Sequence, residues 1–150
     1  MRFDDLLKEG QLKRERTDAR KIQEFLGFAS SEIEAAKYLL PKFKTEAYKS
    51  AYDALIHAGN ALIRSYGYRP TQRFTHATIT ECTDRVLGGE YSQLVGQFKR
   101  MRRKRHPLQY DAVFVESAEE VAKSINDASA LIDRIREHIN NRTPEAPLFQ

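Results

Sequence analysis

Apolar residues recur along the chain at the three- and four-residue steps of amphipathic helices. The first such stretch begins after Thr17 and Asp18, either of which suits a helix N-cap, and Pro41 ends it. The second covers about residues 45–66, where alanines and tyrosines gather on one side, so we expect it to be the most buried helix. Gly67 follows directly and suits the left-handed position that ends many helices.

Three further helices are predicted in the second half of the chain. A short one is expected at about residues 74–87, before a pair of glycines, and another begins near residue 90 and runs into a basic segment. The last begins at Ser117, which stands three residues before Glu120 in a capping-box pattern, and it keeps its apolar period as far as Ile139.

This pattern predicts an all-α fold, an antiparallel up-and-down bundle of four to five helices with short connections. No strand-like alternation of useful length is present, and residues 68–72 are expected to form a connection. The bundle is expected at residues 17–140, with residues 1–16 as an N-terminal arm or short helix and residues 141–150 as a flexible C-terminal tail.

Composition narrows the class of protein. With 150 residues, 41% of them apolar, the chain can bury a core as one domain without disulfides. Cys82 is the single cysteine and no CxxC or HExxH spacing occurs, so we expect no metal and no other cofactor. No stretch has the apolar length of a membrane helix or a signal peptide, which predicts a cytoplasmic protein without a membrane partner.

The positive charge is concentrated in one segment, because six of the seven residues at 99–105 are Lys or Arg while the net charge is only +4. At about 100° per residue, Arg105 falls in line with the apolar stripe of its helix and Arg102 borders it, whereas Arg100 and Arg103 point elsewhere. That stripe consists of Tyr91, Leu94, Phe98 and Met101. A guanidinium there needs an acidic partner, a phosphate or a route to water. Arg105 is therefore a candidate site residue, although cations are also favoured at any helix C-terminus.

Two segments resemble a known family. The string RMRRKRHPLQYD, following a helix with AYDALIHAGNALIRSYGYRP, resembles HEPN domains (higher eukaryotes and prokaryotes nucleotide-binding), and EFLGFASSEIEAAKYLL resembles their first long helix. The resemblance covers roughly residues 18–140. It implies a HEPN-like helical bundle with a functional arginine, a polar residue after it, and a histidine a turn or more further on. Many members are metal-independent ribonucleases, and members commonly form homodimers.

Two alignments with that motif are open. The first places the arginine at Arg105 and the polar residue at His106, with Tyr110 in the place of the histidine. The second pairs Arg100 with His106, but it puts Arg100 on the helix face opposite the apolar stripe, so the first is preferred.

The first alignment implies a set of roles. Arg105, His106 and Tyr110 become the candidate catalytic residues, and Arg102, Arg100 and Arg103 the candidate contacts to substrate phosphate. Asp53 and Asp111 are candidates to pair with the arginines and orient them. For His57 and Asn60, on the buried second helix, the simplest interpretation is a hydrogen-bonded pair of core residues.

The expected function follows from these roles but stays open between alternatives. Histidine, with a pKa of about 6.5, suits transfer of the RNA 2′-hydroxyl proton, whereas tyrosine, with a pKa of about 10, is a poor base. We expect an RNA- or nucleotide-binding homodimer, either a metal-independent ribonuclease acting as a toxin or in defence, or a non-catalytic adaptor for an antitoxin or another protein partner. A structural bundle with a merely solvated basic surface is the third alternative.

Overall fold

In the computed structural model, which describes residues 2–105 and 116–142, these residues form six helices and one small sheet. The elements in chain order are α1 (Asp4–Lys8), β1 (Leu12–Arg14), α2 (Ala19–Leu39), α3 (Lys44–Ser65), β2 (Tyr68–Pro70), α4 (Thr75–Leu87), α5 (Ser92–Arg105) and α6 (Ala118–Arg142). The predicted all-α bundle is confirmed, and its helices lie close to the predicted ranges. Among the described residues, no helix combines the length and apolarity needed to cross a bilayer.

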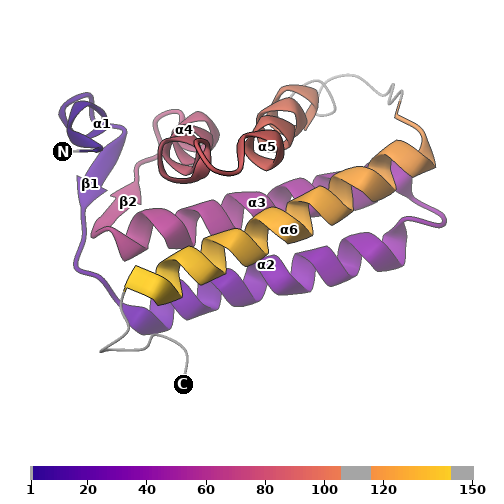
Figure 1. Cartoon of the computed structure of the whole chain (residues 1–150), viewed down its shortest axis with the longest axis horizontal. Coiled ribbons are helices and arrows are strands. Elements are labelled where there is room, and N and C mark those ends of the chain that lie inside the picture. The colour runs from indigo at the N-terminus through magenta and orange to yellow at the C-terminus, as the bar shows by residue number, and fades with distance from the viewer. Residues whose placement is uncertain (1, 106–115, 143–150) are drawn as a thin grey trace.

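The three long helices α2, α3 and α6 lie side by side, and α2 runs opposite to the other two (Figure 1). The shorter helices α4 and α5 cross above α3 and are seen nearly end-on in Figure 1. Helix α3 contacts all four of these helices, so it is the centre of the fold. Half of its residues are buried, which confirms that the second helix is the most buried one.

The core forms where the apolar stripes of these helices meet. Helix α5 buries Val95, Phe98 and Met101 completely, while Tyr91 and Leu94 pack at the margin of the core. Helix α6 buries a stripe of isoleucines at the predicted spacing. The phase of α5 therefore agrees with the stripe expected from the sequence, and Arg105 lies one turn beyond Met101 on the same side.

Local signals fixed several helix ends. The Asp18 side chain caps α2 by accepting from the backbone N–H of Arg20 at 3.0 Å. Ser117 and Glu120 form the predicted capping box, with both reciprocal bonds at 3.0 Å. Gly67 adopts the expected left-handed conformation after α3, with φ of +86°.

The N-terminal segment differs from expectation, because it contributes a strand as well as a short helix. Leu12 pairs with Pro70 and Arg14 with Tyr68 in a two-stranded antiparallel sheet, so part of the expected connection at 68–72 is a strand. The segment is fastened to the bundle by a two-point ion pair between Arg85 and Asp5, at 2.7 and 2.8 Å. Strands of three residues are too short to show an alternating pattern.

We predict that Gly59 is required for the close contact between α3 and α4. A Cβ atom at Gly59 would stand 2.4 Å from Cγ2 of the buried Ile79, so Gly59→Ala must force the helices apart. Overpacking of this kind costs about 1–3 kcal/mol, more than the gain of up to about 1 kcal/mol in helix propensity. Chemical denaturation should show lower stability for Gly59→Ala. Gly27→Ala on the exposed side of α2, with no neighbour in the way, should be neutral or stabilising.

Candidate functional site

Arg105 is the last residue of α5, and it differs from the other cations of its segment in its surroundings. Its Nε and Nη1 atoms are buried, yet they have no hydrogen-bond partner in the described part of the chain. Guanidinium N–H groups removed from water without an acceptor are costly. The position therefore favours an incoming acceptor, and an anion most of all.

Three side chains from α3 and α4 lie within electrostatic reach of Arg105. Its positive charge acts to lower the pKa of Tyr52, Asp53 and His76, although desolvation by burial is the largest influence on each. For Asp53 burial dominates, so its pKa is raised above the ordinary value. Among the described residues Asp53 forms no direct hydrogen bond or ion pair with Arg105 or Arg102. It shares their surroundings without neutralising either charge.

His76 meets α3 through a single polar contact. Its Nδ1 atom lies 3.0 Å from the hydroxyl of the buried Tyr52, and the two ring centroids are 5.5 Å apart. Desolvation by burial lowers the pKa of His76, the charge of Arg105 adds to this, and Asp53 opposes it. These influences favour the neutral form of His76, and the residue is exposed to solvent.

His57 forms a short hydrogen bond across to α2. Its Nδ1 lies 2.5 Å from Oε1 of Glu32, and the rings of Phe25 and Phe28 contact the imidazole at centroid distances of 6.0 and 5.5 Å. The hydrogen bond to Glu32 raises the pKa of His57, the charge of Asp53 adds to this, and burial opposes it. The His57 side chain is 33% exposed, so a ligand can reach it.

These polar residues form one stripe on α3. Asp53, His57, Asn60 and Arg64 recur at the spacing of a single helical face. The expected pairing of His57 with Asn60 is wrong, because Asn60 accepts from Nε of Arg64 at 2.7 Å while His57 bonds Glu32. Antiparallel packing of α2 on α3 brings Glu32 to His57, a pairing that neither helix reveals alone.

The other five cations of the basic segment are either paired with a carboxylate or exposed. Arg100 and Lys104 each approach Oε1 of Glu116 at 2.9 Å, and the Glu116 side chain is only 1% exposed. The contacts lack hydrogen-bond geometry, so the attraction is chiefly between charges. Arg102 and Arg103 are exposed. Lys99 binds Oδ2 of Asp84 on α4 at 2.7 Å. Within the described residues, burial without a hydrogen-bond partner distinguishes Arg105 from the other five cations.

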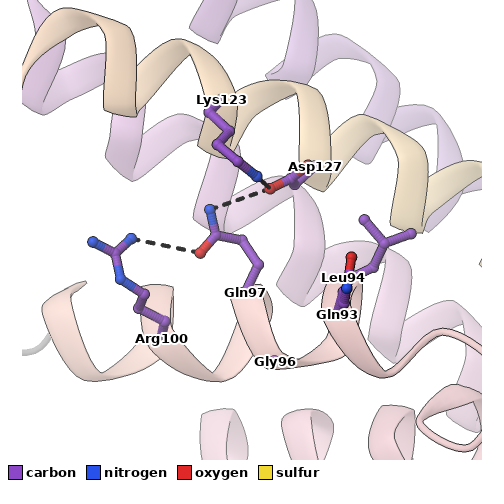
Figure 2. A pocket seen from close by; sticks show the side chains of 7 residues that line it. All are labelled: Gln93, Leu94, Gly96, Gln97, Arg100, Lys123 and Asp127. Carbon is purple, nitrogen blue, oxygen red and sulfur yellow. Dashed lines mark hydrogen bonds and ion pairs between the residues drawn. The ribbon is translucent and has the colours of Figure 1, made fainter.

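A pocket of about 360 Å³ lies between α5 and α6, beside Arg100 (Figure 2). It is lined by Gln93, Leu94, Gly96, Gln97, Arg100, Lys123 and Asp127. Lys123 binds Asp127 at 2.8 Å, and the amide of Gln97 bridges from Arg100 to Asp127 (Figure 2). Since its cations already have partners, this pocket is poorly suited to an anion. It offers little support for the alignment that begins at Arg100.

Three predicted site residues remain. His106, Tyr110 and Asp111 lie outside the described residues. Two neighbours of the Arg105 region, Glu32 and His76, were not predicted from the sequence. Neither lies in the arginine motif, and the packing of α2 and α4 on α3 brings them to this face.

The described residues, 2–105 and 116–142, offer neither a metal site nor a reactive cysteine. No group of three or more His, Cys, Asp or Glu side chains there is placed to hold a metal ion. Burial raises the pKa of Cys82 to about 12, so its thiol is a poor nucleophile.

Comparison with protein families matches residues 11–138 to the HEPN domain. The matched range includes β1, all of α2 to α5 and most of α6, and therefore Arg105 and the whole polar stripe of α3. Comparison with curated proteins finds no match.

We predict that the two histidines of this region titrate on opposite sides of the ordinary value of about 6.5. By NMR, His57 should keep its proton to higher pH than that, and His76 should lose it at lower pH. Asp53→Asn should lower both pKa values, because its carboxylate favours both imidazolium forms. Asp133→Asn on α6 is the control and should leave both unchanged. His57 titrating below His76 would contradict the structure.

Proposed function

The chain belongs to the HEPN domain family, and on that premise we propose that it binds RNA phosphate through Arg105 and cleaves RNA as a metal-independent endoribonuclease. The observation that carries the proposal is the pair of buried Arg105 nitrogens, which have no acceptor among the described residues. A phosphate supplies both the acceptor atoms and the opposite charge.

The chemistry fits the groups gathered around Arg105. In cleavage of this kind the 2′-oxygen attacks the neighbouring phosphorus and the bond from phosphorus to the 5′-oxygen breaks. The products are a 2′,3′-cyclic phosphate and a 5′-hydroxyl end. A proton leaves the 2′-hydroxyl and another is supplied to the 5′-oxygen. Arg105 stabilises the charge that builds on the phosphoryl oxygens, and imidazole groups suit the proton transfers.

The exposed arginines extend the proposal to a longer strand. Arg102 and Arg103 are solvent-facing on the last turns of α5, where they are free to contact phosphates on either side of the cleaved one.

Cleavage of transcripts inside a cell is harmful, so a role as a toxin or a defence ribonuclease, countered by an antitoxin, belongs to the same proposal. In the adaptor alternative, the same exposed cations bind an acidic protein and Tyr110 leaves the site inactive.

We further propose a homodimer in which two Arg105 sites share one RNA. Two exposed aromatic residues support this: Phe28, 52% exposed, contacts His57 from α2, and Phe74, 61% exposed, stands just before α4 and close to His76. Exposed apolar side chains that flank a site are typical of an interface.

Light scattering should therefore give twice the chain mass of 17.3 kDa. The double variant Phe28→Ser with Phe74→Ser should shift the protein toward monomer, because it removes apolar surface from the proposed interface. Tyr38→Ser, which removes an 87% exposed ring from another side of α2, is the control and should stay dimeric. A monomeric wild type would contradict this part of the proposal.

The ribonuclease proposal is tested with purified protein and single-stranded RNA, with and without a chelator. Cleavage should continue in the chelator, and Arg105→Ala should reduce it about 100-fold or more, as loss of a charge-stabilising donor does. Arg20→Ala removes the same charge from the exposed start of α2 and should leave cleavage unchanged.

The other outcomes separate the alternatives. Binding that depends on Arg105 without any cleavage supports the adaptor. Cleavage that the chelator abolishes, or that Arg105→Ala leaves intact, would contradict the proposed function. Absence of both cleavage and RNA binding would leave the basic segment as a solvated surface.

A further inference from the structure

Two histidines outside the arginine motif lie around Asp53, whose carboxyl is also within reach of the charge of Arg105. His57 comes from α3 and His76 from the first turn of α4, and each is fixed by one hydrogen bond through Nδ1. Neither Nε2 has a hydrogen-bond partner in the described part of the chain. Both side chains are partly accessible, so both Nε2 atoms remain available for proton transfer to a ligand.

Both histidines and Arg105 lie within electrostatic reach of Asp53. The charges of Arg105, His57 and His76 all act on the Asp53 carboxyl, and Glu32 acts on it from α2. Asp53 and His57 are four residues apart on α3, which places their Cβ atoms about 6 Å apart. The charge of Arg105 acts directly on His76, and His57 adjoins the same Asp53 carboxyl. A phosphate bound between Arg105 and Asp53 would be approached by His76 from α4 and by His57 from α3.

The two hydrogen bonds give the histidines different chemistry. A carboxylate at Nδ1 of His57 stabilises the imidazolium, because the charged ring donates to the negatively charged Glu32. A neutral phenol at Nδ1 of His76 provides no such charge, and burial with a nearby arginine favours the uncharged ring. One group is thus suited to donate a proton and the other to accept one.

We propose that His57, held by Glu32, is the general acid of RNA cleavage in this protein and that His76, held by Tyr52, is the general base. This rests on the proposed ribonuclease function and assigns its proton transfers to α3 and α4 instead of to His106 or Tyr110.

The proposed step takes one proton from the RNA and returns one to it. Nε2 of His76 takes the proton of the 2′-hydroxyl as the bond from that oxygen to phosphorus forms. Nε2 of His57 gives its proton to the 5′-oxygen as the bond from phosphorus to that oxygen breaks. For this, Nδ1 of His76 donates to the Tyr52 oxygen and Nδ1 of His57 donates to Glu32. Arg105 holds the phosphate throughout without changing its protonation.

The test is the pH dependence of single-turnover cleavage for the wild type, His57→Gln, His76→Gln and Glu32→Gln. An acid and a base give the wild type a bell-shaped profile, whose acidic limb reports the base and whose basic limb reports the acid. Each histidine variant should lose about 100-fold or more in rate while RNA affinity changes little. His57→Gln should also lose the basic limb, and His76→Gln the acidic limb.

Glu32→Gln distinguishes a proton-transfer role of His57 from a merely structural one. The amide keeps an acceptor for His57 but removes the negative charge, so the pKa of His57 falls and the basic limb shifts to lower pH. The acidic limb should stay in place. His138→Gln is the matched control, since His138 lies near the C-terminal end of α6, where it is hydrogen-bonded to Tyr66. The pH profile of this variant should equal that of the wild type. Circular dichroism checks that each variant is folded.

The cleavage assays distinguish failure of the histidine assignment from failure of the proposed ribonuclease function. If the wild type cleaves RNA in an Arg105-dependent way but either histidine variant retains the wild-type rate, the assignment is overturned and the ribonuclease stands. A lower rate in both variants with both limbs of the pH profile unchanged would also overturn it. If the wild type cleaves no RNA, the proposed function and this assignment fail together.

Discussion

The packing of α3 against four other helices is the constraint on which the rest of the structure depends. Its buried sides consist largely of small residues, which let the neighbouring helices approach closely, and Gly59 meets α4 with no room for a Cβ atom. Only one stripe of α3 is left for polar groups, from Asp53 to Arg64. The same packing that builds the core therefore collects Glu32, His57 and His76 on a single face.

The charge of the basic segment is divided by the way α5 meets α6. Glu116 is buried directly before α6, where Arg100 and Lys104 approach its carboxylate. These two cations help to hold the helices together, and Lys99 does the same for α4 and α5 through Asp84. Six neighbouring cations are thus not one functional patch. The cations of the segment without a carboxylate partner among the described residues are Arg105 and the exposed Arg102 and Arg103.

Features that depend on one helix could be predicted from the sequence. The phase of α5 follows from its buried stripe, which places Arg105 on the inner side, and the Asp18 and Ser117 caps depend on residues a few positions apart. The pairing of β1 with β2 could not be predicted, because each strand has three residues and the partner is far along the chain. The bond from His57 to Glu32 was missed for a similar reason. It depends on how α2 is rotated against α3, and periodicity does not give that rotation.

The electrostatics of the face follow from the same placement. A carboxylate from α2 raises the pKa of His57, while burial beside Arg105 lowers that of His76, although both histidines lie near Asp53. Two imidazoles in one solvated patch would titrate alike, because water would screen both. Here different helices supply the partners, so one ring is stabilised as a cation and the other in its neutral form. An arginine and two histidines with separated pKa values are the groups that phosphodiester cleavage needs when the protein itself supplies the charge stabilisation.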